Sequence, residues 1–332
     1  MDVHLSAWLI LGAIVVGLIV FDVVAHVRTP HEPTMKESAY WTAGYIILAI
    51  VFGLVIWAIW GAGYSGEYFA GFVTEKALSV DNLFVFVIII STFRVPRQYQ
   101  QKVLLYGIVI ALVLRLIFIL VGGAIIERFS WIFYVFGIWL LWTAWSQARQ
   151  GKEGEHDVSE GEYKENLFSR LARHILPVSD GIVGQRLIIR RRGKTMVTPL
   201  LLCIVALGGA DLMFAFDSIP AIFGLTSEPF LVFSANAFAL LGLRQLYFLL
   251  DGLLSKLVYL HYGLAVILGF IGVKLVLHAL HENTVPIING GQGLPVPEIG
   301  IPLSLGVIFG TILVTVAASL FAARGGKEED GG

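Results

Sequence analysis

The sequence predicts an all-α polytopic membrane protein with about nine transmembrane helices. Of its 332 residues, 57% are hydrophobic and only 14% are charged, and the mean hydropathy is +0.81. A soluble domain carries about 25% charged residues. Apolar windows of about 20 residues, the length that a helix needs to cross roughly 30 Å of hydrocarbon, recur along the chain. They are 5–25, 40–60, 67–92, 103–126, 131–147, 199–224, 230–251, 258–280 and 300–323.

The distribution of basic residues predicts the orientation in the membrane. Of the 23 Lys and Arg residues, four lie inside the apolar windows. When the other 19 are assigned to alternate connections, 18 fall on one side and only Arg128 falls on the other. The positive-inside rule makes the basic side cytoplasmic, so the N-terminus is expected outside and the C-terminus inside. The first window has no basic n-region and no cleavage site, and we interpret it as a retained span.

These windows divide the chain into five segments. The segment 1–66 holds two N-terminal spans. Two three-span units, 67–147 and 199–280, are separated by a cytoplasmic loop at 148–198. The last segment, 281–332, contains an outer loop, the ninth span and a cytoplasmic tail.

The loop 148–198 is the only sizeable hydrophilic segment. Its stretch "NLFSRLARHILP" has apolar residues at helical spacing and basic residues on other faces, which predicts an amphipathic helix against anionic lipid. "GQRLIIRRRGKTMVTP" predicts a short hairpin that turns at Arg192, Gly193 and Lys194. Because "RRRGK" flanks a span on the basic side, we interpret it as a topology determinant near anionic lipid. We expect no nucleic acid as a partner, and the sequence identifies no partner protein.

An acidic motif occurs twice in the apolar spans. "EKALSVDN" in the third span matches "DLMFAFDS" in the sixth at an offset of 136 residues. The matched polar residues are Glu75, Asp81 and Asn82 in the first copy and Asp211, Asp217 and Ser218 in the second. In the next spans, "VLRLIFIL" around Arg115 matches "GLRQLYFL" around Arg244 at an offset of 129. Three spans per unit predict an inverted repeat of spans 3–5 and 6–8, as in secondary transporters whose sites lie near the midplane.

The buried acids need an explanation because their insertion is costly. An ionised Asp at the centre of a spanning helix is unfavourable by about 2.5–3.5 kcal/mol. Such residues mark an ion path or a proton relay, or they form structural ion pairs. The structural explanation stays open, because Lys76, Arg115 and Arg244 could neutralise three of the four acids.

Helix geometry limits how one copy of the motif could bind an ion. Six residues advance about 9 Å and rotate about 240° along an ideal helix, so Glu75 and Asp81 cannot reach one ion from a straight helix. Either the helix unwinds between them, or the ion sits where two helices cross. In the second copy Pro220 has no N–H, which frees the carbonyl of Phe216 as an oxygen ligand. The first copy has no matching proline.

The residue types narrow the class of ion. Carboxylates, the Asn82 amide, the Ser79 and Ser218 hydroxyls and backbone carbonyls are hard oxygen donors, and neither motif contains His or Cys. Oxygen-only sites suit Mg²⁺, Ca²⁺ and Mn²⁺, and the residue types do not separate these three. Carboxylic acids at the same site could carry protons in exchange, because burial and mutual repulsion favour their protonated form.

Other features have simpler interpretations. Asp22 and Glu67 are expected near the ends of their spans, where water reaches them, and a role in helping metal pass is the alternative. His278 in "HALHE" is expected to be an interfacial residue without a role, and Trp139 in "WLLWTAW" an interface anchor. The single Cys203 excludes an intrachain disulfide. No GxxxxGK, GxGxxG or nucleophile elbow is present, so we expect neither an enzyme nor a tightly bound cofactor.

Four stretches carry a family resemblance. "EKALSVDNLFVF", "HILPV…GQRLIIRRRGKTMVTPL", "GADLMFAFDSIPAIF" and "NAFALLGLRQLYF" resemble the TerC family of bacterial membrane proteins over roughly 66–280. That family, first named for tellurium resistance, is similar to a LysE-like superfamily of exporters built from three-span repeats. The resemblance implies a bacterial inner membrane and Mn²⁺ efflux. The family's acidic residues carry over onto Glu75, Asp81, Asp211 and Asp217, with Asn82 and Asn236 as helpers.

Together these features predict a secondary transporter that exports a divalent cation by proton antiport, with Mn²⁺ as the favoured ion. The predicted metal ligands are Glu75, Asp81, Asn82, Asp211 and Asp217. Predicted helpers are Ser79, the Phe216 carbonyl, Ser218 and Asn236, and the charge is balanced by Lys76, Arg115 and Arg244. Two alternatives remain: a Ca²⁺/H⁺ exchanger, and a non-transporting assembly or stress factor in which the ion pairs only specify packing.

Overall fold

The computed structural model of the 332-residue chain describes most of its length. The described residues are 1, 3–24, 33–129, 131–153, 178–179, 182, 184–191, 194–250, 259–283, 285 and 287–329. The amphipathic helix predicted within 148–198 lies outside them. The backbone of Asp81 is described, but its side chain is not.

The described part of the chain is a bundle of long helices, and the predicted all-α polytopic class is confirmed. The helices are α1 (Leu5–Asp22), α2 (Met35–Trp60), α3 (Ala62–Thr92), α4 (Arg97–Arg128), α5 (Ile132–Glu153), α7 (Pro199–Phe223), α8 (Pro229–Leu241), α9 (Leu243–Leu250), α10 (Leu260–His281) and α11 (Ile301–Glu329). Helices α8 and α9 meet at Gly242 and together form one traverse. Each of the nine predicted windows therefore coincides with a helical traverse.

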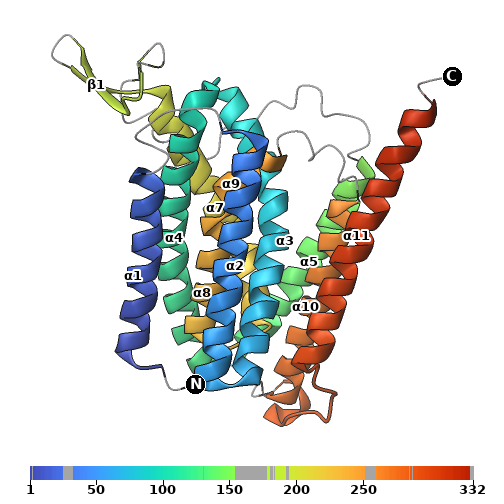
Figure 1. Ribbon diagram of the computed structural model, residues 1–332. Coiled ribbons are helices and arrows are strands. Elements are labelled where there is room, and N and C mark those ends of the chain that lie inside the picture. The colour runs from blue at the N-terminus through green and yellow to red at the C-terminus, as the bar shows by residue number, and fades with distance from the viewer. Residues whose placement is uncertain are drawn as a thin grey trace.

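Length and composition identify seven traverses in the described part of the chain as candidate membrane spans. They are formed by α1, α2, α4, α7, α8 with α9, α10 and α11. Helices α3 and α5 run beside them (Figure 1). In α3 the charged residues Glu75, Lys76 and Asp81 lower the hydropathy of an otherwise apolar segment. The first acidic motif thus lies in a helix that is less apolar than the spans around it.

Successive traverses alternate in direction, and the two ends of the chain lie at opposite ends of the bundle (Figure 1). Strands β1 (Ile188–Arg191) and β2 (Lys194–Val197) pair antiparallel, so a hairpin is present where the sequence predicts one. We name the two ends of the bundle the hairpin end and the Met1 end. Helix α3 starts at the Met1 end, whereas α7 starts at the hairpin end (Figure 1). The two units thus run in opposite directions, as an inverted repeat requires, while their internal symmetry stays a prediction.

The helices form two groups. Helix α5 packs most extensively against α10, and α11 packs against α10 and α3. We call α5, α10 and α11 the three-helix layer, which lies on one side of the bundle in Figure 1. A Cβ added at Gly272 would lie 3.0 Å from the carbonyl oxygen of Gly137, so glycines let α5 and α10 approach closely. The remaining helices, α1–α4 and α7–α9, form the core bundle.

Helix α8 lies at the centre of the core bundle. Its residues from Phe230 to Leu241 are all buried. A helix that is apolar on every face is expected to be surrounded by other helices. Its neighbours include α3, α4 and α2. Asn236 is therefore a polar side chain in a fully enclosed position, with an exposed fraction of 0%.

Candidate functional site

Both acidic motifs lie on unbroken helices. Helix α3 is helical from Ala62 to Thr92, and α7 is helical from Pro199 to Phe223 even though Pro220 lies within it. The two helices pack against each other. Of the two arrangements open to the sequence, the structure therefore has crossing helices rather than unwound ones. The Phe216 carbonyl still has no amide donor at Pro220, and its role as a ligand stays a prediction.

The helical period selects which motif residues share a face. Residues separated by three and by seven positions lie on one side of a helix. Glu75, Leu78 and Asn82 therefore share a face of α3. At the offset of 136, the matching residues on α7 are Asp211, Phe214 and Ser218. Positions 75 and 81 of α3 face different directions, so α3 alone cannot bring both acids to one ion. A site that contains Glu75 must therefore include residues of a second helix.

Arg115 on α4 connects the two acidic faces. Its Nε donates to Asp211 Oδ2 at 2.8 Å, and its Nη2 donates to Asp211 Oδ1 at 3.0 Å, which forms a bidentate pair. Its Nη1 donates to Glu75 Oε1 and to Ser218 Oγ, the latter at 3.2 Å. The exposed fractions of Arg115, Glu75 and Asp211 are 0%, 0% and 1%. We call these four residues the Arg115 cluster.

The charges of the Arg115 cluster do not cancel. It contains one guanidinium and two carboxylates, so it carries a surplus negative charge when both acids are ionised. The second carboxylate oxygen of Glu75, Oε2, is buried and has no hydrogen-bond partner among the described residues. A buried charge is stable only when it is paired, coordinated to a metal or neutralised by a proton. Counted without the neighbouring Lys76 ammonium, whose charge also acts on Glu75, the cluster can therefore accept one further positive charge.

A small cavity adjoins this cluster. Its volume is about 80 Å³, and its polar lining residues are Asn82, Gln147, Asp217 and Ser218. Ser218 also accepts from Arg115, so the cavity and the cluster share a wall. A water molecule occupies about 30 Å³ in the liquid, so the cavity has room for a few waters or a partly hydrated ion. We call this space the inner cavity.

Asp217 has a partner that the sequence did not predict. Trp139 Nε1 donates to Asp217 Oδ1 at 2.8 Å. The Trp139 ring also lines an apolar pocket between α4, α5 and α7, so it separates the carboxylate from that pocket. The predicted role of Trp139 as an interface anchor stays a prediction, and the structure adds its contact with Asp217. The indole N–H is a single donor, and a carboxylate is a strong acceptor for it even though the Trp139 side chain is 42% exposed.

Gln147 is a second residue that sequence reasoning missed. It lines the inner cavity and lies 3.0 Å from His261 Nδ1 on α10. Gln147 is in the last part of α5, which leads toward the hairpin end. The residue had no distinguishing pattern in the sequence, because a glutamine near the end of a span is ordinary.

Several buried polar atoms near the motifs have no protein partner among the described residues. Buried polar groups are hydrogen-bonded in more than about 90% of cases. The unpartnered atoms of α3 and α8 are Thr74 Oγ1, Glu75 Oε2, Ser79 Oγ, Asn82 Nδ2, and both Nδ2 and Oδ1 of Asn236. The predicted helpers Ser79 and Asn236 are thus buried with free polar atoms. Water or an ion could satisfy these atoms.

Two of the predicted charge-balancing residues make their hydrogen bonds outside the cluster, although the charge of Lys76 still acts on the neighbouring Glu75. Lys76 Nζ donates to the carbonyl oxygen of Ala239 at 3.0 Å. Arg244 Nη2 donates to Asp22 Oδ1 at 2.9 Å, and Tyr45 Oη donates to the same oxygen at 2.7 Å. A water-exposed position was expected for Asp22, and this expectation is wrong because its exposed fraction is 1%. Asp22 ends α1 facing into the bundle, where Arg244 and Tyr45 compensate its burial.

The four predicted acidic ligands are therefore only partly brought together. Glu75 and Asp211 both contact Arg115, and Asp217 lines the adjoining inner cavity. The side chain of Asp81 is outside the described residues. Among the described residues, no three His, Cys, Asp or Glu side chains are placed to hold one metal ion. Shared coordination of a single ion stays a prediction.

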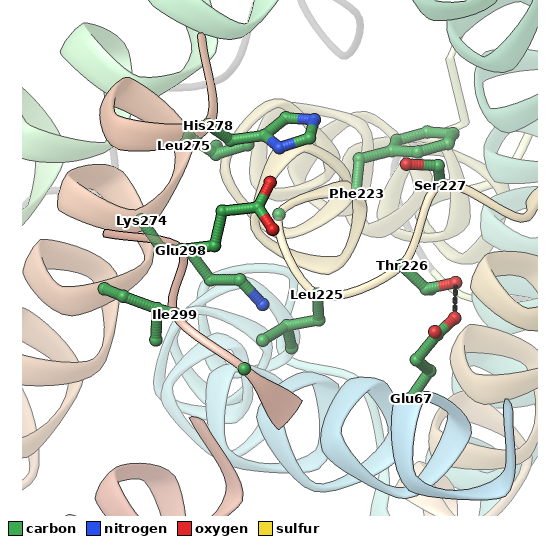
Figure 2. A pocket seen from close by; sticks show the side chains of 12 residues that line it. Glu67, Phe223, Leu225, Thr226, Ser227, Lys274, Leu275, His278, Glu298 and Ile299 are labelled. Carbon is green, nitrogen blue, oxygen red and sulfur yellow. Dashed lines mark hydrogen bonds between the residues drawn. The ribbon is translucent and has the colours of Figure 1, made fainter. Parts of the chain in front are cut away.

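A larger pocket opens at the Met1 end, between α3, the α7–α8 connection, α10 and the start of α11 (Figure 2). Its volume is about 400 Å³. Its polar lining includes Glu67, Thr226, Lys274, His278 and Glu298. Thr226 Oγ1 donates to Glu67 Oε2 at 2.5 Å. Figure 2 shows the Lys274 amine and the Glu67 and Glu298 carboxylates around this space.

These features define a class: a multi-pass helical membrane protein with a charged cluster and, beside it, a small cavity lined by both polar and apolar side chains. Comparison with known proteins gives the family. The chain belongs to the integral membrane protein TerC family, which matches residues 60–327. The family resemblance carried by the acidic motifs is therefore confirmed.

Its relatives are membrane proteins from several bacteria. An uncharacterized membrane protein of Mycobacterium tuberculosis strain H37Rv is 51% identical over 318 residues, which cover 96% of this chain and 80% of that protein. An uncharacterized membrane protein of Myxococcus xanthus is 36% identical over 318 residues, covering 96% and 93%. The "Putative membrane-bound redox modulator Alx" of Escherichia coli strain K12 is 35% identical over 298 residues, covering 87% and 85%. No solved structure matches the chain.

Proposed function

We propose that this protein is a secondary transporter that exports a divalent cation, Mn²⁺, across a bacterial inner membrane by proton antiport. One observation carries the proposal. The Arg115 cluster holds two buried carboxylates against one guanidinium, and it shares Ser218 with a polar cavity of about 80 Å³. Surplus negative charge beside an enclosed polar space is suited to a cation that enters and leaves.

The choice of ion rests on the donor atoms and on the family. The inner cavity and the cluster offer carboxylate, amide and hydroxyl oxygens, which favour Mg²⁺, Ca²⁺ or Mn²⁺ over Zn²⁺ or Cu⁺. Mg²⁺ gives up its water reluctantly and is a poor fit to a site that must strip and restore hydration. The TerC resemblance favours Mn²⁺ over Ca²⁺.

The residues have the following proposed roles. The cation enters the inner cavity from the hairpin end, which the positive-inside rule makes cytoplasmic. Asp217, Asn82 and Ser218 receive it there, and Glu75 and Asp211 lie next on its way. Arg115 weakens the binding of the ion to these two acids, because its guanidinium competes with the ion for the same carboxylate oxygens. Protons on the carboxylates balance the charge once the ion has left.

The position of the inner cavity suits alternating access. Its walls come from α3 and α7 of the core bundle and from α5 and α10 of the three-helix layer. Movement of one group against the other would change the walls on both sides of the bound ion. Inverted-repeat transporters work in this way, with a central site between two groups of helices.

The redox description of one relative has no thiol counterpart here. A thiol–disulfide reaction needs an accessible thiolate and a second thiol. This chain has one cysteine, Cys203, and it is buried. We propose no enzymatic activity and no resident cofactor, and any redox effect would follow from the transported metal.

The proposal is tested with purified protein in lipid vesicles that contain a Mn²⁺-sensitive dye. Under an imposed pH gradient, Mn²⁺ uptake is expected for the wild type. Glu75→Gln and Asp211→Asn each remove a charged ligand, and uptake should fall at least about 10-fold, the equivalent of about 1.4 kcal/mol. The matched control is Glu282→Gln, whose carboxylate is 54% exposed.

Three results would change the proposal. Equal uptake by the wild type and Asp211→Asn would remove the Arg115 cluster from the ion path. Uptake of Ca²⁺ that Mn²⁺ does not inhibit would favour the Ca²⁺/H⁺ exchanger. If the folded wild-type protein transports neither Mn²⁺ nor Ca²⁺, the remaining interpretation is a non-transporting assembly or stress factor.

A further inference from the structure

The pocket in Figure 2 and the inner cavity lie along one face of α3. Glu67 lines the pocket, Asn82 lines the inner cavity, and Glu75 lies between them. Positions 67, 71, 75, 78 and 82 fall within about 80° of one another around an ideal helix. The rise of about 1.5 Å per residue places Glu67 about 12 Å and Asn82 about 10 Å from Glu75 along the axis. The buried acids thus lie midway between two polar spaces.

The packing around Gly71 closes the route from Glu75 to the pocket. A Cβ at Gly71 would lie 3.1 Å from Ile222 Cγ2 and 3.3 Å from Ala235 Cβ. Ile222 and Ala235 have exposed fractions of 0%. Helices α3, α7 and α8 therefore meet here without space for a water molecule. The closure lies within the roughly two helical turns that separate Glu67, which faces the pocket, from Glu75, which belongs to the Arg115 cluster.

We propose that the pocket at the Met1 end is the chamber through which the hydrated cation leaves the protein. The contact of Gly71 with Ile222 and Ala235 is the gate that separates this exit chamber from the buried carboxylates. The inference rests on the proposed transport of a divalent cation. It adds three statements to that proposal: the cation leaves through the exit chamber, Gly71, Ile222 and Ala235 form the gate, and this gate is closed in the structure.

The chemistry of the exit chamber suits release rather than retention. A divalent ion with six waters needs about 180 Å³ for its water shell, and the chamber has about 400 Å³. The carboxylates of Glu67 and Glu298 attract a hydrated cation. Lys274 places an ammonium in the same space, so an ion can pass without being held by both acids (Figure 2).

Cysteine accessibility tests the gate without depending on transport. The single native Cys203 is fully buried and gives a low background. Ser227→Cys places a thiol in the exit chamber, and Leu78→Cys places one in the inner cavity. A small, membrane-impermeant cationic methanethiosulfonate is applied from the Met1 side of oriented membranes. The chamber thiol should react at least about 10-fold faster than the cavity thiol, because the gate is closed.

Widening the gate should remove this difference. In Gly71→Ala the added Cβ would lie 3.1 Å from Ile222 Cγ2, so the packing at the gate must shift, and modification of Leu78→Cys should accelerate about 5-fold or more. Gly63→Ala on the same helix is the matched control, since a Cβ there meets nothing within 4 Å. Ile222→Ala is a second gate variant, which removes the larger contact of Gly71 instead of adding one. Equal reactivity of the two thiols in the wild type, or no acceleration in either gate variant, would overturn the gate.

Lys274→Gln tests the exit chamber. Without the ammonium, Mn²⁺ alone added from the Met1 side should protect Ser227→Cys from modification at about 10-fold lower concentration, because two carboxylates then act unopposed. Identical protection with and without the Lys274→Gln substitution would overturn the role of the chamber in cation release. If the cysteine accessibilities match these expectations but the protein transports no metal in vesicles, the gate proposal stands and the proposed transport of Mn²⁺ is wrong. The two proposals therefore fail separately.

Discussion

The two buried arginines of the repeat have different partners. Arg115 on α4 contacts two carboxylates, those of Glu75 and Asp211. Arg244 on α9 pairs with one carboxylate among the described residues, that of Asp22, and also donates to Gln101 Oε1 at 3.3 Å. The two repeated arginines thus lie in different surroundings, Arg115 against two carboxylates and Arg244 against one carboxylate within the described part of the chain.

The spaces beside the two arginines also differ in size. The Arg115 cluster adjoins an inner cavity of about 80 Å³, while Gln101, beside Arg244, lines a space of about 10 Å³. A neutral buried pair needs no further ion, and its parts depend on each other for stability. A cluster with surplus charge needs a proton or a metal ion. Under the proposed function, the first region binds the ion and the second contributes to packing, and the following predictions test that division.

The largest expected difference is in transport. Asp217→Asn and Asp81→Asn each remove a proposed carboxylate ligand, and Mn²⁺ transport per folded molecule should fall at least about 10-fold. Asp22→Asn makes the same chemical change beside Arg244, and transport per folded molecule should stay within about 2-fold of the wild type. Vesicle uptake normalised to folded protein measures both. Loss of transport in Asp22→Asn equal to that in Asp217→Asn would break the comparison.

The next difference is in stability and its rescue. Arg244→Met leaves the Asp22 carboxylate buried without this guanidinium, which should lower the free energy of unfolding by about 3–5 kcal/mol. Adding Asp22→Leu removes both charges, so the double variant should recover most of that loss and should still transport Mn²⁺. The thermal unfolding midpoint in detergent measures the stability of each variant.

The equivalent double change in the first region has a different outcome. Arg115→Met with Asp211→Leu still leaves Glu75 buried without its guanidinium partner, so neither stability nor transport should recover. Recovery of transport in this variant would mean that the Arg115 cluster is also only a structural ion pair. That outcome would favour the non-transporting alternative.

The sequence predicted the fold because the spans are local features. Each apolar window is long enough to cross a bilayer, and each coincides with a helical traverse, including α3 with its charged motif. The acids Glu75 and Asp211 were found because each lies in an apolar window and the same short motif surrounds both, which requires no knowledge of contacts. The seven-residue spacing that places Asn82 on the Glu75 face follows from the helical period, and sequence reasoning could have used it.

The remaining contacts could not be predicted because they join distant segments. Arg115 meets Asp211 across 96 residues, Trp139 meets Asp217 across 78, and Arg244 meets Asp22 across 222. Periodicity within one helix does not specify which face of another helix it meets. Asp22 shows the consequence, since its place at the end of a span indicated water, whereas the packing of α1 turned it inward.

The smallest expected effect concerns the boundary of the ion-binding region. Trp139→Phe keeps an aromatic ring but removes the N–H that donates to Asp217, so the Mn²⁺ concentration for half-maximal transport should change by about 5-fold, the equivalent of about 1 kcal/mol. Trp142→Phe is the matched control on the same helix, because Trp142 contacts the Trp139 ring and is 55% exposed. Equal effects of the two substitutions would mean that Trp139 contributes only its ring, and the ion-binding region would then end at Asp217.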